Sequence, residues 1–129
     1  MFPFLQSQSA IWHYPYTQEG LQMETQRITE HPILGVPQKG GLVTFTFDGR
    51  EMQGYEGEPV AVALRAQGIL KHRETSRQHK PRGIFCAIGR CTDCVMVVDG
   101  VPNTRTCITP LRQGMKVETQ YGCSNKKTW

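Results

Sequence analysis

Hydrophobic and polar residues alternate along LVTFTF, residues 42–47, and this alternation predicts a β-strand with one buried face. Its valine and two phenylalanines share the apolar face, with threonines on the other. Asp48 and Gly49 follow directly and form a strong signal for a two-residue hairpin turn. The next segment, REMQGY at residues 50–55, is therefore expected to return as the second strand of a hairpin.

A helical pattern replaces the alternation in EGEPVAVALRAQGI, residues 56–69. Glu58 is expected in the first turn, Pro59 suits the first helical position, and Gly68 suits the C-terminal stop. The apolar residues that would form one stripe facing the sheet are Val60, Ala63, Leu64 and Ile69. The pattern predicts a short helix packed on the sheet.

Three further strands are expected after a long loop. VMVV at 95–98 is uniformly apolar, and the following Asp99-Gly100 pair predicts a second hairpin turn. The return strand spans 101–107, where Pro102 suits a sheet edge or a strand start. MKVETQ at 115–120 is the last strand. The predicted order is thus strand, strand, helix, long loop and three strands.

The chain divides into a lead-in of residues 1–40, a folded domain of residues 41–122 and a short tail of residues 123–129. The lead-in has little periodicity, and Met23 is a plausible true start. The preceding 22 residues are then an artefact of the assumed start, or else a disordered tail or an arm that docks on a partner.

Length and charge narrow the class of protein. A chain of 129 residues suits one modest domain with its own core. Lys plus Arg exceeds Asp plus Glu by 15 − 11 = 4, a mildly basic balance that is only a weak argument for nucleic acid, and none is expected as a partner. No apolar run approaches the roughly 20 residues of a membrane span, and no secretory signal is recognised. We therefore expect a cytoplasmic protein with reduced thiols.

One segment, KHRETSRQHKPR at residues 71–82, carries five Lys or Arg against one Glu. Its excess of four positive charges equals the net charge of the whole chain. One interpretation is a solvated loop, and the other is a docking or electron-steering patch. It lacks the interleaved aromatic residues of a single-strand nucleic-acid surface.

The clearest chemical signal is the set of cysteines. Cys86, Cys91 and Cys94 have the spacing C-x4-C-x2-C, and Cys107 follows after twelve residues and one predicted hairpin. The plant-type [2Fe–2S] site has the pattern C-x4-C-x2-C…C. A hairpin between the third and fourth cysteines can bring their sulfurs together. The spacing therefore predicts a [2Fe–2S] cluster held by these four thiolates.

The residues between the cysteines suit such a site. Ala87 and Gly89 allow the backbone to approach the cluster, so that N–H groups can stabilise its negative charge. Arg82 and Arg90 add positive charge nearby, which should raise the reduction potential. The apolar residues expected to shield the cluster from water are Ile84, Phe85, Ile88 and Val95.

Other uses of the cysteines fit less well. Structural zinc sites usually have paired short spacings, and only one such spacing is present. A catalytic cysteine needs a histidine base, and all four histidines lie outside the motif: His13, His31, His72 and His79. An odd total of five cysteines fits poorly with a disulfide framework. Cys123, near the chain end, is interpreted as a spare surface thiol.

Several segments resemble one known family: RITEHPILG, YEGEPVAVALRAQGI, PRGIFCAIGRCTDCVMVVDGVPNTRTC and PLRQGMKVET. Over about residues 27–121 the chain resembles the small (2Fe-2S)-binding subunits of flavoprotein dehydrogenases. That family includes the small subunits of proline and hydroxyproline dehydrogenases, opine oxidases and hydrogen cyanide synthase. The resemblance is most specific from Pro81 to Pro110.

The resemblance implies an α+β, β-grasp ferredoxin-like fold, with a mixed sheet, one main helix and a cluster-binding loop. It implies that Cys86 and Cys91 hold one iron, and Cys94 and Cys107 the other. It also implies a non-catalytic electron-transfer subunit that assembles with FAD-containing dehydrogenase or oxidase subunits as a hetero-oligomer. Two alternatives stay open, a free-standing soluble [2Fe–2S] ferredoxin and a non-enzymatic zinc module. Soluble ferredoxins are usually acidic, which the basic charge of this chain does not match.

Overall fold

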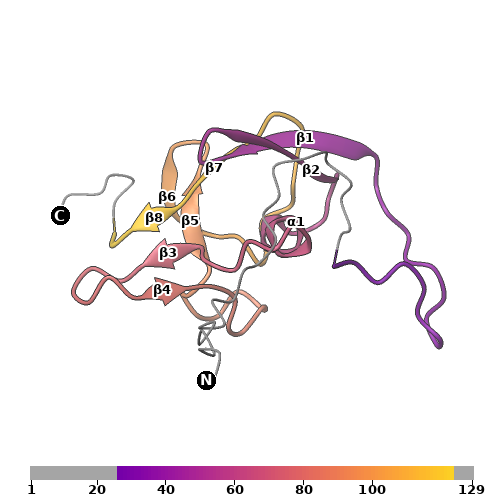
Figure 1. Ribbon diagram of the computed structural model, residues 1–129, viewed down its shortest axis with the longest axis horizontal. Helices are drawn as coiled ribbons and strands as arrows, with labels where there is room; N and C mark the ends of the chain where they lie inside the picture. Colours follow the sequence, from indigo (N-terminus) through magenta and orange to yellow (C-terminus); the bar gives the residue numbers. More distant parts are fainter. Residues whose placement is uncertain (1–25, 124–129) are drawn as a thin grey trace, which may run out of the picture.

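The computed structural model describes residues 26–123, and the earliest predictions, on Met23 and the first 22 residues, lie outside this range. It contains one short helix and eight strands arranged in two sheets (Figure 1). The elements are β1 (Leu42–Phe47), β2 (Arg50–Tyr55), α1 (Val60–Ala66), β3 (Arg73–Glu74), β4 (Pro81–Arg82), β5 (Val95–Val98), β6 (Val101–Arg105), β7 (Lys116–Glu118) and β8 (Gln120–Tyr121).

The larger sheet has five strands in the order β2-β1-β7-β5-β6. β1 pairs antiparallel with β2 and parallel with β7, so the sheet is mixed, as expected for an α+β, β-grasp ferredoxin-like fold. Both predicted hairpin turns are confirmed, because Asp48-Gly49 and Asp99-Gly100 have positive φ at both positions. Pro102 lies in β6, an edge strand of this sheet, also as predicted.

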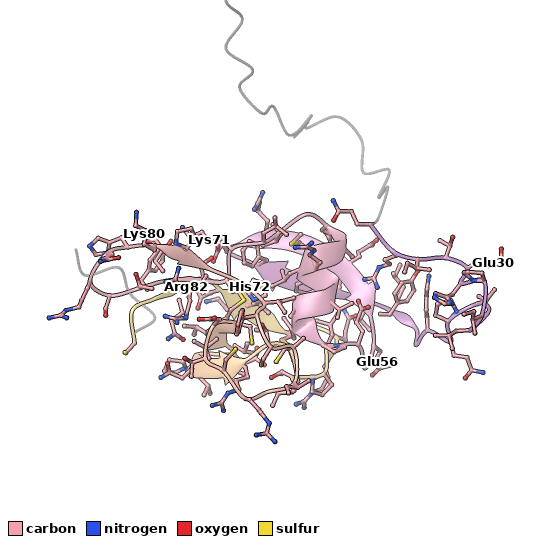
Figure 2. All side chains as sticks on the ribbon, turned by 90° about the horizontal axis from the view of Figure 1, so that it is seen from below. Glu30, Glu56, Lys71, His72, Lys80 and Arg82 are labelled. Atoms are coloured by element: carbon pink, nitrogen blue, oxygen red, sulfur yellow. The ribbon has the colours of Figure 1, made fainter. Side chains whose placement is uncertain are left out.

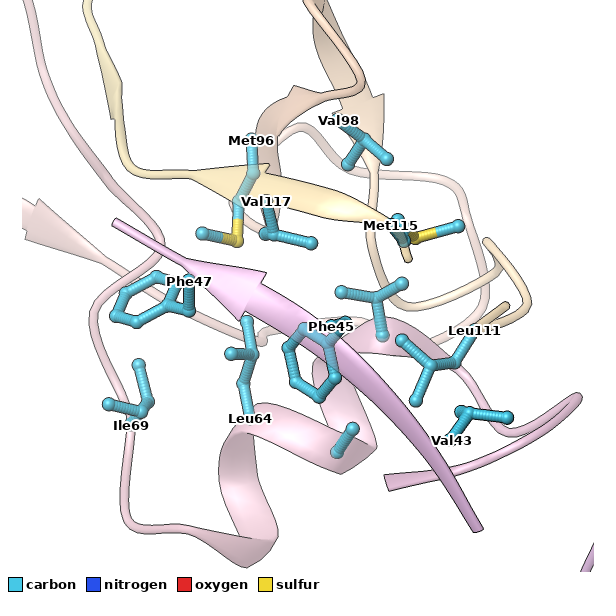
Figure 3. Packing of buried hydrophobic residues seen from close by; sticks show 12 residues of the cluster. Val43, Phe45, Phe47, Leu64, Ile69, Met96, Val98, Leu111, Met115 and Val117 are labelled. Atoms are coloured by element: carbon cyan, nitrogen blue, oxygen red, sulfur yellow. The ribbon is translucent and has the colours of Figure 1, made fainter. Parts of the chain in front are cut away.

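The apolar core lies between the larger sheet and α1 (Figure 3). Val43, Phe45 and Phe47 of β1 are buried, which confirms the alternation of this strand. The helical stripe is also confirmed, since every one of its members is buried: Val60, Ala63, Leu64 and Ile69. The helix is shorter than the predicted segment, since Pro59 is the N-cap and Gln67 the C-cap. The predictions that Pro59 is the first helical residue and that Glu58 lies in the first turn are therefore wrong, because both residues precede the first helical position.

Two predictions about the strands are wrong in detail. The segment 71–82 is not one loop, because it contains β3 and β4, which pair antiparallel. The last predicted strand, 115–120, is split between β7 in the larger sheet and β8, which pairs parallel with β3. These short strands make the second sheet, in the order β4-β3-β8.

Part of the lead-in is ordered on the domain. The guanidinium group of Arg27 donates to Glu58 Oε1 at 2.7 Å, and the backbone N–H of Gln26 donates to the carbonyl oxygen of Ala66. Beyond this anchor the segment before β1 extends away from the sheet as an arm (Figure 1). Ile33 and Leu34 on this arm are 85% and 81% exposed.

Candidate metal centre

The cysteine loop, residues 83–94, connects β4 to β5. The loop begins at Gly83, whose backbone packs closely against Leu70. A Cβ atom on Gly83 would lie 2.1 Å from the backbone oxygen of Leu70. Within the loop, Ala87 and Gly89 have φ of 58° and 76°, in the left-handed region. These two turns bend the chain sharply around the cysteine side chains, at the two positions where the sequence predicted a close backbone approach.

Cys86 and Cys91 form the first pair of thiols. The backbone N–H of Cys91 donates to Cys86 Sγ at 3.4 Å, and the N–H of Ile88 donates at 3.5 Å. These two hydrogen bonds lower the pKa of Cys86 to about 6, and a hydrogen bond from the Cys91 side chain makes a smaller contribution. Hydrogen bonds to the charged form favour that form, so the loop stabilises a thiolate at Cys86.

Cys94 and Cys107 form the second pair, which is buried together with Ala61 of α1. The hairpin of β5 and β6 brings them together, as predicted, and Thr106 N donates to the carbonyl oxygen of Cys94 at 3.4 Å. Burial raises the pKa of Cys107, and a hydrogen bond with the Cys94 side chain raises it further. A hydrogen bond from the backbone N–H of Gly89 partly opposes this rise in pKa. The loop therefore contacts the thiol of Cys107 as well as that of Cys86.

None of the four thiols predicted as ligands is in a disulfide, and side-chain contacts join them as two pairs, Cys86 with Cys91 and Cys94 with Cys107. Within residues 26–123, no three His, Cys, Asp or Glu side chains gather in a way that could hold a metal ion. Two pairs of thiolates match the ligand set of a [2Fe–2S] cluster, in which each iron would take two of them. Cys123 is exposed, in agreement with its interpretation as a surface thiol.

Two arginines hold the loop from neighbouring strands. Arg73 Nε donates to the carbonyl oxygen of Thr92 at 2.9 Å, and Arg73 Nη2 lies 3.4 Å from Asp93 Oδ1. Arg105 Nε donates to the carbonyl oxygen of Cys91 at 3.0 Å. The sequence predicted positive charge from Arg82 and Arg90, and Arg82 Nε indeed lies 4.0 Å from Asp93 Oδ1 of the loop. The contacts of Arg73 and Arg105 were missed because nothing local in the sequence aims these two side chains at the loop.

The apolar residues predicted to shield the cluster differ in exposure. Val95 is buried, whereas Ile84, Phe85 and Ile88 are 40%, 81% and 66% exposed, and their role as a shield for the cluster stays a prediction. Ile108 is 57% exposed, and its side chain packs so closely on the loop that a Cβ at Gly89 would lie 2.9 Å from Ile108 Cδ1. Four exposed apolar side chains thus belong to the cysteine loop or pack against it, and we name them the loop face: Ile84, Phe85, Ile88 and Ile108.

A histidine also lies beside the cysteines. Sequence reasoning placed all four histidines outside the motif, yet His72 is fully buried and in hydrogen-bonding reach of the Cys94 backbone. Its pKa is lowered by burial, and the contact with the Cys94 backbone partly opposes this shift. His72 is thus neutral at physiological pH.

A separate groove lies elsewhere on the described chain. It has a volume of about 600 Å³ and runs between the lead-in and α1, with Arg27, Tyr55 and Val62 among its lining residues. No cysteine lines it, so it is separate from the thiol pairs. Among residues 26–123 there is also no helix with the length and apolar character needed to cross a bilayer.

Comparison with known proteins agrees with this geometry. The family model of a 2Fe-2S iron-sulfur cluster binding domain matches residues 41–122. The alpha subunit of sarcosine oxidase from Rhizobium meliloti is 36% identical over 94 residues, which are 69% of this chain and 9% of that subunit. Hydrogen cyanide synthase subunit HcnA from Pseudomonas aeruginosa is 35% identical over 78 residues, 60% of this chain and 74% of that subunit.

A solved structure gives the same result. L-proline dehydrogenase from P. horikoshii superimposes with a TM-score of 0.56 and 32% sequence identity. The match covers 70% of this chain and 18% of that one. The chain therefore spans a small part of the sarcosine oxidase and proline dehydrogenase chains, and most of the hydrogen cyanide synthase subunit.

Proposed function

Because this chain belongs to the 2Fe-2S iron-sulfur cluster binding domain family, we propose that it is the electron-transfer subunit of a multi-subunit, FAD-dependent amine or imino-acid dehydrogenase. The cluster, when bound, supplies a centre that accepts and releases one electron at a time. The chain itself is non-catalytic in this proposal: its residues hold the cluster, set its surroundings and present it to a partner.

The arrangement of the thiols carries the proposal. Cys86 and Cys91 would hold one iron, and Cys94 and Cys107 the other, in keeping with the two observed pairs. The N–H groups that already point at Cys86 Sγ would stabilise the negative charge of the ligand. The guanidinium groups of Arg73 and Arg105 fix the loop by its backbone oxygens and add positive charge nearby.

The chemistry of the relatives supports the choice of reaction. By name, one relative is an oxidase of sarcosine and another a dehydrogenase of proline. Sarcosine and proline are both secondary amines, which favours oxidation at a carbon–nitrogen bond in the complex. This chain has no G-x-G-x-x-G segment that follows a strand and opens a helix, so the FAD is assigned to a partner subunit. We place the complex in the cytoplasm.

The loop face is the surface proposed to meet that partner. It is apolar, exposed and adjacent to the cysteines, and apolar patches of this kind mark protein–protein contacts. In two relatives the matching domain is 9% and 18% of a longer chain, so there it lies among other parts of the same protein. A free-standing ferredoxin, the second candidate, would leave the loop face in water.

Purification from the native host tests the proposal. A tagged copy of the chain is expected to co-purify with flavin-containing subunits at a fixed ratio, together with iron and acid-labile sulfide in equal amounts. Phe85→Ser should lower the yield of the flavin subunits while the iron content stays unchanged. Val101→Ser is the matched control, because Val101 is 60% exposed but lies at the far end of β6 from Cys107.

Each alternative has its own result. A chain that carries iron and sulfide but no flavin partner would be a free-standing ferredoxin. A chain that carries zinc without sulfide would be a zinc module, and the electron-transfer proposal would then fail.

A further inference from the structure

His72 is a buried histidine whose ring lies within hydrogen-bonding reach of the backbone of Cys94, a predicted cluster ligand, and of the hydroxyl of Thr106. His72, Thr106 and Cys94 are all at most 1% exposed. His72 Nδ1 lies 3.2 Å from Thr106 Oγ1, and Thr106 Oγ1 lies 2.7 Å from the carbonyl oxygen of Cys94. Figure 2 shows His72 near the end of the molecule that carries Lys71, Lys80 and Arg82, opposite Glu30.

The direction of these hydrogen bonds follows from counting protons. A carbonyl oxygen only accepts, so the single hydroxyl proton of Thr106 is donated to Cys94. Thr106 Oγ1 can then accept from a ring proton on His72 Nδ1, and the backbone of Cys94 also lies within hydrogen-bonding reach of the ring. The imidazole and the hydroxyl are therefore both directed at the peptide of Cys94.

The backbone of His72 is fixed on both sides. Its N–H donates to the carbonyl oxygen of Arg82 at 2.8 Å, and its carbonyl oxygen accepts from the N–H of Gln120 at 3.2 Å. The next residue, Arg73, holds the loop at Thr92 and Asp93. Two consecutive residues at the start of the small sheet, His72 and Arg73, therefore contact the cysteine loop.

The other ring nitrogen gives the second observation. Among the described residues, His72 Nε2 is buried and has no hydrogen-bond partner. A buried polar atom without a partner destabilises the folded state, and an apolar side chain of similar size would fill the space without that cost. The contribution specific to the imidazole is therefore its bond from Nδ1.

We propose that His72 is a positioning residue for the Cys94 ligand, and that its ring acts on the Cys94 peptide together with the hydroxyl of Thr106. The proposal rests on the assignment of Cys94 as a ligand in the proposed function. Partners of this kind orient metal ligands, and their loss typically weakens metal binding by about 10–100-fold. Without the bond from His72, the Cys94 peptide would hold its sulfur in a less defined orientation.

Two matched pairs of variants test this inference in the full chain purified alone. Thr106→Val removes the hydroxyl at nearly constant volume, and Thr106→Ser keeps it. His72→Asn places an amide N–H near the position of Nδ1, whereas His72→Gln places it near Nε2. Thr119→Val is the control for the loss of a buried hydroxyl, because Thr119 is also buried but bonds through its hydroxyl to Asp48 and not to the Cys94 peptide.

Three quantities are measured: the rate of iron release to a chelator, the paramagnetic spectrum after dithionite reduction, and the unfolding midpoint. Thr106→Val and His72→Gln are expected to release iron about ten-fold faster and to change the spectrum. Thr106→Ser and His72→Asn should stay near wild type in both. The double variant Thr106→Val/His72→Gln should release iron more slowly than the product of the two single effects predicts, because both residues act on the same Cys94 peptide.

The opposite pattern would overturn the inference. It is wrong if Thr106→Val and His72→Gln only lower the unfolding midpoint, as Thr119→Val should, and leave iron release and spectrum unchanged. It is equally wrong if His72→Asn behaves like His72→Gln. The assay needs no partner subunit, so a failure to find flavin subunits would count against the proposed function and leave this result unaffected.

Discussion

The five-stranded sheet and the cysteine loop of this protein are held in different ways. The sheet and α1 enclose an apolar core in which Phe45 and Leu64 are at most 1% exposed (Figure 3). In the loop, residues 83–94, Phe85 and Ile88 are 81% and 66% exposed. Hydrogen bonds to its backbone fix the loop, from Arg73 and Arg105 among others.

This difference assigns separate tasks to the two regions. Burial of apolar surface is non-directional and supplies most of the stability of a domain. It cannot by itself aim a sulfur atom, whereas hydrogen bonds are directional. The sheet therefore provides a stable platform, and the loop provides a shaped site whose apolar side chains remain available for contact with another protein.

The largest expected effect is the loss of a thiol from the loop's second pair. Cys107→Ser should abolish the visible absorption of the cluster, because a hydroxyl is a much poorer ligand for iron than a thiolate. Cys123→Ser is the control and should keep the absorption, since Cys123 is exposed and outside both pairs. If Cys107→Ser stays coloured and Cys123→Ser does not, the fourth ligand has been assigned to the wrong cysteine.

The next effect concerns the platform. Leu64→Ala should lower the free energy of unfolding by about 2–5 kcal/mol, because Leu64 is fully buried in the core. Val62→Ala on the same helix should change it by less than about 0.5 kcal/mol, since Val62 is 43% exposed. Urea titration measures both values. Similar losses for the two variants would show that burial on α1 is not what stabilises the sheet.

The smallest effect tests whether the loop keeps its shape without iron. Since N–H groups lower the pKa of Cys86 to about 6, its thiolate is expected to persist until the pH falls through that value. After removal of iron by a chelator, the rate of Cys86 alkylation should therefore rise to half its maximum near pH 6. Mass spectrometry of the labelled peptide follows this reaction.

The same chain in urea provides the reference for this profile. There the hydrogen bonds to Cys86 are lost, and half-maximal alkylation should move to the ordinary cysteine pKa of about 8.5. Identical profiles in native buffer and in urea would mean that the loop is shaped by the metal alone.

Much of the platform could be predicted from the chain itself. The alternation in residues 42–47 and the two Asp-Gly turns are local signals, and each was confirmed as a strand or a turn. β3, β4 and β8 were not predicted as a sheet, because each has only two residues and such a length carries no periodicity. Their pairing depends on segments far apart in the sequence.

The candidate site likewise has features that the sequence predicted and features that only the tertiary structure showed. The spacing of the four cysteines and the glycine and alanine between them determined which chemistry the loop can perform, because ligand type and reach are properties of a short segment. Only the tertiary structure decided that His72 lies against Cys94, that Arg73 and Arg105 hold the loop, and that Phe85 faces outward. The hydrogen bonds among these residues join positions that are 14 to 34 residues apart in the sequence, and no local pattern encodes them.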